Sequence, residues 1–131
     1  MKKFNLSVII IATMAVSLAA CQPTNQTIRI DAQDAGETIN MKIGDTLIVK
    51  LYGNVTTGYN WIPAPQEPVL LMQEGNSKVT PDSDLIGAPG DIVLEFTAVA
   101  QGQTVLRLDH KRSWETDVPP MESYQVTVVV E

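Results

Sequence analysis

The sequence predicts an all-β fold on the basis of two observations. Apolar and polar residues alternate along several short segments, which is the pattern of a strand with one buried face. Clusters of Gly, Pro and Asp separate these segments, and helical periodicity is nearly absent. About seven or eight short strands of this kind are typical of an immunoglobulin-like antiparallel β-sandwich. No disulfide is expected, because Cys21 is the only cysteine.

The clearest alternation lies in residues 45–52, 91–99, 103–109 and 124–130. The inward rows of these segments supply the predicted core, which contains Leu47, Val49, Leu94, Phe96, Leu106, Val126 and Val128. Shorter candidate strands cover residues 27–30, 37–43, 59–62, 69–73 and 77–80. Trp61 lies in one of these, and we expect it to pack into the core beneath the preceding loop.

The N-terminus has the form of a bacterial lipoprotein signal peptide, predicted here for residues 1–20. Lys2 and Lys3 precede an apolar stretch that is too short to span a bilayer comfortably and that ends in small residues. Leu18-Ala19-Ala20-Cys21 resembles a lipobox, in which the cysteine thiol receives diacylglycerol. We therefore expect a lipid anchor on Cys21, a tether over 21–26, and one domain over 27–131.

The charge of the chain limits its partners. The formal net charge is −6, and it becomes more negative when Lys2 and Lys3 leave with the signal peptide. Such an acidic domain is not expected to bind nucleic acid or to adhere electrostatically to anionic lipid. We expect a monomer that reaches the membrane only through Cys21. Gln22, in place of an Asp, favours the outer membrane in a Gram-negative cell, with the domain facing the periplasm or the cell surface.

Three irregular segments next to predicted strands stand out by their chemistry. Asn54-Val55-Thr56-Thr57-Gly58-Tyr59 is a small polar turn, and Gly87-Ala88-Pro89-Gly90 is a Gly/Pro loop just before another predicted strand. Arg112-Ser113-Trp114 places a large aromatic side chain in a polar turn. Loops of this kind gather at one end of a sandwich, so we expect them to form a binding edge.

These three motifs, in this order and spacing, resemble those of the chagasin family of cysteine peptidase inhibitors. The resemblance covers residues 37–131, and the ordered set is far more specific than any one motif. Val55, Pro89 and Ser113 depart from the family pattern, which has Pro, Gly and Pro there. Such departures reshape loops, and they bear on affinity and target choice more than on fold.

The resemblance implies a reversible, competitive inhibitor of papain-like cysteine peptidases that occludes the active-site cleft with three loops. The first loop would enter the cleft as a blunt wedge, with its shape set by Gly58. No enzymatic activity, cofactor or metal is expected. The residues implied in peptidase binding are Asn54, Thr56, Thr57, Gly58, Tyr59, Gly87, Gly90, Arg112 and Trp114.

Other interpretations of the same residues remain open. Taken alone, the turns at 56–58 and 87–90 can be ordinary solvent turns, and Arg112 can simply be solvated. A catalytic role for His110 with Asp109 and Ser113 is disfavoured, because neighbouring residues at a strand end do not converge. The acidic stretch 82–84 lacks the ligand set of a calcium site. A lipoprotein that binds without inhibiting, or that inhibits another enzyme such as lysozyme, is the alternative function.

Overall fold

The computed structural model describes residues 17, 19 and 22–131. The predicted lipid attachment at Cys21 and most of the predicted signal peptide lie outside the described residues. Helical structure in the described part is limited to two short 3-10 turns, η1 (Ala32–Asp34) and η2 (Val55–Thr57). Neither turn, nor any other described segment, forms a helix that is long and apolar enough to cross a membrane.

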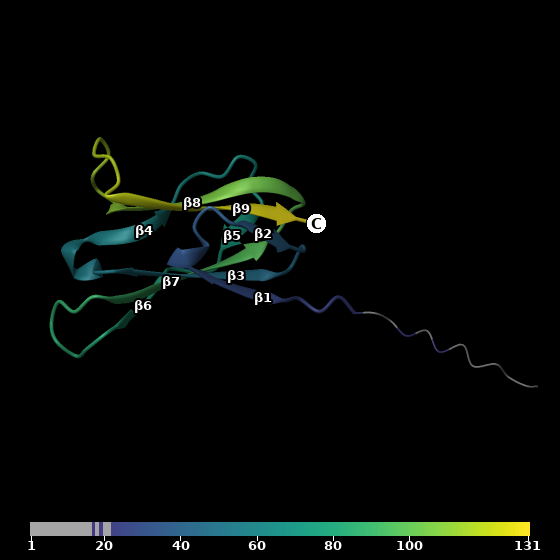
Figure 1. Cartoon of the computed structure of the whole chain (residues 1–131), viewed down its shortest axis with the longest axis horizontal. Coiled ribbons are helices and arrows are strands. Elements are labelled where there is room, and N and C mark those ends of the chain that lie inside the picture. The colour runs from purple at the N-terminus through teal and green to yellow at the C-terminus, as the bar shows by residue number, and fades with distance from the viewer. Residues whose placement is uncertain (1–16, 18, 20–21) are drawn as a thin grey trace, which may run out of the picture.

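Nine strands form two sheets that pack face to face (Figure 1). The first sheet has the order β1-β3-β7-β5, with β6 also paired to β7, and the second has the order β2-β9-β8-β4. The strands are β1 (Thr27–Asp31), β2 (Thr38–Met41), β3 (Thr46–Gly53), β4 (Tyr59–Pro63), β5 (Leu71–Gln73), β6 (Lys78–Pro81), β7 (Gly90–Ala98), β8 (Gly102–Arg112) and β9 (Glu122–Val130). All nine candidate segments therefore form strands, and the predicted all-β sandwich is confirmed.

Two strand pairs differ from the expected antiparallel arrangement. β1 runs parallel to β3, and β2 runs parallel to β9, whereas the other pairs are antiparallel. The chain passes from β1 in one sheet to β2 in the other through η1. Asp31 accepts a hydrogen bond from the Gln33 amide and donates its own amide to Asp34 Oδ2, each at 2.8 Å. This reciprocal capping fixes the crossover and lets one short segment supply an edge strand to each sheet.

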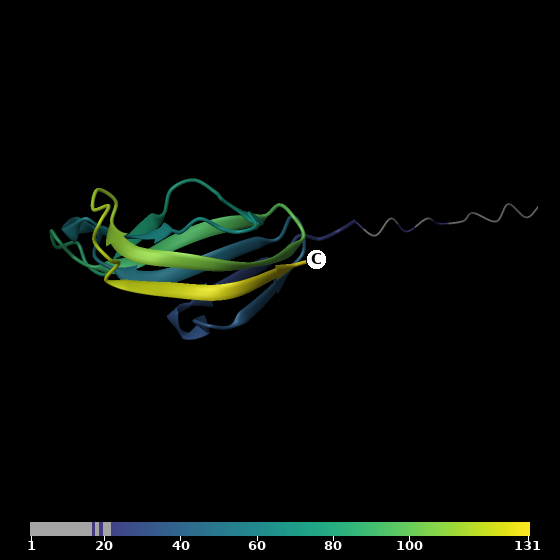
Figure 2. The same cartoon turned by 90° about the horizontal axis from the view of Figure 1, so that it is seen from above.

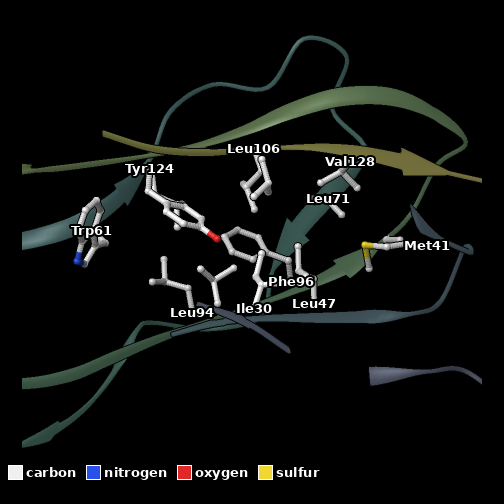
Figure 3. Packing of buried hydrophobic residues seen from close by; sticks show 14 of the residues in the cluster. Ile30, Met41, Leu47, Trp61, Leu71, Leu94, Phe96, Leu106, Tyr124 and Val128 are labelled. Atoms are coloured by element: carbon white, nitrogen blue, oxygen red, sulfur yellow. The ribbon is translucent and has the colours of Figure 1, made fainter. Parts of the chain in front are cut away.

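The core lies between the sheets (Figure 3). The predicted inward residues are all buried, and the set is Leu47, Val49, Leu94, Phe96, Leu106, Val126 and Val128. The Tyr124 ring also lies in this layer, and its hydroxyl donates to the Asp31 carbonyl at 2.7 Å. Burial raises the pKa of Tyr124 to about 12. All nine strands and this core lie within residues 27–131.

The two ends of the sandwich contain different parts of the chain. Three connections lie at one end, which we call the loop pole: the wedge loop (54–58), the second loop (82–89) and the third loop (113–121) (Figures 1 and 2). The N-terminal segment and the C-terminus lie at the opposite end, the far pole. The predicted gathering of the three motifs at one end is therefore what the structure shows.

Asp45 organises the far pole. Its buried carboxylate accepts hydrogen bonds from the Gln26 and Lys42 amides, each at 2.8 Å. These hydrogen bonds, with the Gln26 contribution the larger, hold the pKa of Asp45 below its ordinary value of 3.8. Its carbonyl accepts from the Ala98 amide at 3.0 Å. One residue thus ties the start of the domain to the first sheet.

Candidate functional site

The wedge loop is a single 3-10 turn that is capped at both ends. The Asn54 side chain accepts from the Thr56 amide at 3.1 Å and from the Thr56 hydroxyl at 2.5 Å. The Thr57 hydroxyl donates to the Asn54 carbonyl at 2.6 Å. Gly58 ends the turn with φ +86°, in the left-handed region that favours glycine. Four small or polar residues therefore hold the loop in one shape by local hydrogen bonds.

Gly58 also faces the third loop. A Cβ atom built on Gly58 would overlap the indole ring of Trp114. Any larger residue there would have to displace the Trp114 ring and adopt a strained backbone conformation. Two features therefore make Gly58 decisive for the shape of the wedge loop: its left-handed backbone conformation and the neighbouring Trp114 ring.

Arg112, the last residue of β8, joins the wedge loop to the third loop. Its Nε donates to the Thr57 carbonyl at 3.0 Å, and its Nη1 pairs with Glu115 Oε1 at 3.1 Å. The guanidinium lies 4.4 Å from the centroid of the Tyr59 ring and 6.0 Å from that of Trp114. Arg112 is therefore not simply solvated, because its Nε and Nη1 bonds hold the wedge loop and the third loop together.

The second loop is tied to the wedge from the other side. Asn54 Nδ2 donates to the Gly87 carbonyl at 2.9 Å, and Gly87 has φ +83°. At the base of this loop, the Asp82 amide donates to the Pro89 carbonyl at 2.8 Å. Thus Asn54 caps its own turn with its oxygen and holds the second loop with its nitrogen.

Gly90 has a different position from the one expected. It is the first residue of β7, is buried, and pairs with Pro81 of β6. A Cβ atom on Gly90 would overlap the backbone of Thr80 and Pro81. Gly90 therefore allows two backbones to approach closely at the root of the second loop, and it does not lie at the loop's tip.

The loop pole exposes large apolar side chains on both sides of the wedge. Trp114 is 66% exposed on the third loop, and Leu85 and Ile86 are 77% and 106% exposed on the second loop. Exposed apolar surface of this size marks interaction sites. Sequence reasoning identified Trp114 but missed Leu85 and Ile86. Their signal was two consecutive large apolar residues in a turn rich in Gly and Pro.

Trp61 lies beneath the wedge loop, as expected. Its indole is buried at the loop-pole end of the core, and Nε1 donates to the Tyr52 carbonyl at 3.1 Å (Figure 3). Trp61 and Trp114 therefore divide as predicted into a core residue and an exposed one. The two tryptophans mark the root and the surface of the same loop pole.

The residues considered for catalysis do not converge. Asp109 accepts from the Ser123 hydroxyl at 2.7 Å and pairs with Arg107 at 3.2 Å. His110 is its neighbour on β8, and successive strand residues point to opposite faces. His110 instead stacks on Trp61. Asp109 therefore does not orient the imidazole as a catalytic triad would require.

Comparisons with known proteins agree with this geometry. Residues 40–128 match the chagasin family of peptidase inhibitors, family I42. The chain is 29% identical to chagasin of Trypanosoma cruzi over 99 residues, covering 71% of this chain and 86% of that protein. Its fold matches that of a cysteine protease inhibitor from Entamoeba histolytica with a TM-score of 0.70 and 21% identity, over 84% of this chain and all of the other.

Two further solved structures share the fold. Amebosin matches with a TM-score of 0.62 and 20% identity over 83% of this chain and all of the other. The inhibitor PbICP-C, solved in complex with falcipain-2, matches with a TM-score of 0.50 and 18% identity over 84% of this chain and 95% of the other. Together with the match over 40–128, the sandwich and its three clustered loops show that this chain belongs to the chagasin family of peptidase inhibitors.

Proposed function

We propose that this protein is a reversible, competitive inhibitor of papain-like cysteine peptidases. The observation that carries the proposal is the construction of the loop pole. The wedge loop presents small, uncharged residues whose hydrogen-bonding groups are largely used within the protein. Trp114 on one side and Leu85 with Ile86 on the other supply apolar surface to the walls of a cleft. Membership of a peptidase inhibitor family supports the same conclusion.

The proposed mechanism is occlusion of the cleft, with no chemistry performed by the inhibitor. The wedge would approach the catalytic centre of the peptidase and exclude its substrate. A turn held by Asn54 and closed by Gly58 does not offer an extended backbone for cleavage. Because the three loops are already tied together by Asn54 and Arg112, little conformational entropy would be lost when they bind.

Enlarging the wedge tests this mechanism. Gly58→Glu should weaken inhibition of papain by at least about 100-fold, since the new side chain would displace Trp114 and also obstruct the cleft. Gly36→Glu is the matched control: Gly36 has a similar φ of +82°, but nothing lies within 4 Å of an added Cβ. Inhibition is measured with a fluorogenic peptide, on variants whose folding is confirmed by circular dichroism.

The outcomes separate the alternatives. Equal inhibition by Gly58→Glu and Gly36→Glu would place the contact surface elsewhere on the molecule. Absence of papain inhibition by the parent protein would favour a module that binds without inhibiting. A parallel assay with lysozyme tests the other enzyme class considered from the sequence.

We also propose that the mature protein is held in the bacterial cell envelope by a lipid on Cys21. The support is the lipobox-like Leu18-Ala19-Ala20-Cys21 at the end of an apolar stretch that Lys2 and Lys3 precede. Cys21→Ser should abolish incorporation of labelled palmitate and release the protein from membranes. Equal labelling of the variant and the parent would remove the anchor from this proposal.

A further inference from the structure

His110 lies at the root of the wedge loop and is only 7% exposed. Its imidazole stacks on the Trp61 indole, with centroids 4.7 Å apart and planes 15° apart, and lies 5.5 Å from the Tyr59 ring. A Cβ atom on Gly53 would lie 3.3 Å from His110 Nε2. Gly53 and Tyr59 flank the wedge loop, so the imidazole packs against both of its ends.

Neither ring nitrogen of His110 has a hydrogen-bond partner among the described residues, although both are buried. The Glu122 carboxylate lies 3.6 Å from Nδ1, beyond hydrogen-bonding distance. A neutral imidazole without partners already has an unfavourable environment here, and an imidazolium would need acceptors for two N–H groups. As long as the ring stays stacked on Trp61, no described residue accepts a hydrogen bond from either ring nitrogen.

The charged and titratable groups around the ring come from few elements. β9 supplies Glu122, and β4 supplies the Tyr59 phenol. On β8 itself, Arg112 covers the Tyr59 ring, while Asp109 and Lys111 alternate to the other face of the strand. β3 and β7 contribute the uncharged Gly53 and Ile92. Among these groups, only the Glu122 carboxylate could therefore pair with a proton on the ring.

We propose that His110 is a positioning residue that holds the wedge loop in shape while its imidazole is neutral and releases it on protonation. The proton would bring Nδ1 toward Glu122, and the Nε2–H would have no acceptor in the stack. The ring would then leave Trp61 and Gly53, and Tyr59 would lose one of its supports. The wedge would shift relative to Trp114, and inhibition would weaken as pH falls. This consequence for inhibition rests on the proposed function.

An NMR titration of residues 22–131 tests the coupling without any peptidase. His110 is the only histidine, and imidazole is the side chain that ordinarily changes charge between about pH 5 and 8. The Gly58 amide and the Trp61 indole N–H should shift with the same midpoint as the His110 ring protons. In His110→Phe, which keeps an aromatic ring in the stack, both reporters should stay constant over that range.

Two results of the titration would overturn the proposal. One is protonation of His110 that leaves the Gly58 and Trp61 signals unchanged. The other is an imidazole that stays neutral until the domain unfolds. Glu122→Gln is the matched variant: it removes the carboxylate that attracts the proton, so the shared midpoint should move to lower pH.

The functional arm compares inhibition constants of the parent and His110→Phe for papain at pH 5 and pH 7.5. The ratio of the two constants at each pH cancels the titration of the peptidase. Relative to His110→Phe, the parent should lose about 5-fold or more in affinity at the lower pH. A ratio independent of pH would reject the link to inhibition. If neither protein inhibits papain, the proposed function fails, and the NMR titration still decides the role of His110.

Discussion

At the loop pole, hydrogen bonds join one loop to another, whereas at the far pole they join the start of the domain to a sheet. Asn54 and Arg112 connect the wedge loop to its two neighbours, and large apolar side chains there remain exposed. Asp45, in contrast, is buried and bonds the Gln26 and Lys42 amides. The difference fits the proposed contact between the loop pole and a peptidase, and it assigns the far pole a part in stability. Variants at the two poles should therefore separate these two properties.

The largest effect on stability is expected for a substitution in the core, which lies between the two poles. Phe96→Ala, in the centre of the core, should lower the free energy of unfolding by about 3 to 5 kcal/mol. Urea denaturation of the parent and the variant measures this loss. The molecules that remain folded should inhibit papain as the parent does, because Phe96 pairs with Leu47 and Gln73, which lie outside the three loops. Weakened inhibition by fully folded Phe96→Ala would show that the poles are not independent.

Trp114→Ala should have a large effect on inhibition with little effect on stability. Loss of an interface hot spot costs about 2 to 4 kcal/mol, which is roughly 30-fold to 1,000-fold in the inhibition constant. Because Trp114 is 66% exposed, the free energy of unfolding should change by only about 0.5 kcal/mol. Val105→Ala, at an exposed site on β8, is the control and should leave both quantities unchanged. Unaltered inhibition by Trp114→Ala would contradict the assignment of the contact surface.

Asp45→Ala should show the opposite pattern, a loss of stability without a change in inhibition. Loss of two hydrogen bonds to a carboxylate should lower the free energy of unfolding by about 2 kcal/mol, with inhibition unchanged. The effect should depend on pH, because the pKa of Asp45 is lowered in the folded protein. The contribution of its charged form is fully present above the ordinary pKa of 3.8 and is lost as pH falls below it.

The comparison with Asp45→Asn isolates this charge, since Asn keeps one acceptor oxygen. Its stability should approach that of the parent as the pH falls below 3.8 and the parent carboxylate gains its proton. A difference between the two proteins that stays constant down to acid unfolding would argue against a stabilising charge on Asp45.

The smallest effect tests the link between two loops. Asn54→Ser keeps an oxygen that can cap the turn but removes the donor to the Gly87 carbonyl. Loss of one hydrogen bond should weaken papain inhibition by about 5-fold, corresponding to about 1 kcal/mol. Asn54→Ala removes the cap as well and should weaken inhibition further. Equal inhibition constants for the parent and Asn54→Ser would mean that the second loop does not depend on this bond.

The strands were predictable because burial imposes alternation on the sequence. β3, β7, β8 and β9 each contain an inward apolar row, so both their positions and their buried faces followed from the pattern. The direction of pairing did not follow, because alternation is the same in parallel and antiparallel strands. The parallel pairs of β1 with β3 and β2 with β9 depend on the path of the chain through η1.

The site was predictable as a set of loops, but the contacts within it were not. Arg112 and Thr57 are 55 positions apart, and no local pattern shows that the guanidinium turns inward. Gly90 was expected to belong to the Gly/Pro loop before the strand, yet strand pairing extends to it. The burial of His110 depends on its register opposite Trp61, which is fixed only when β4 and β8 pair. Long-range pairing therefore decided what the local sequence left open.

The parallel pairing of β1 with β3 has a mechanical consequence. β1 enters from the far pole and runs toward the loop pole beside β3 (Figure 1). A pulling force between the N-terminal segment and a partner gripped at the loops would act along both strands in opposite directions. Their hydrogen bonds would then bear the load together in shear, instead of opening one after another as in a zipper. If the lipid anchor and the inhibitory contact proposed above act together, this pairing would let the domain resist unfolding under such a load.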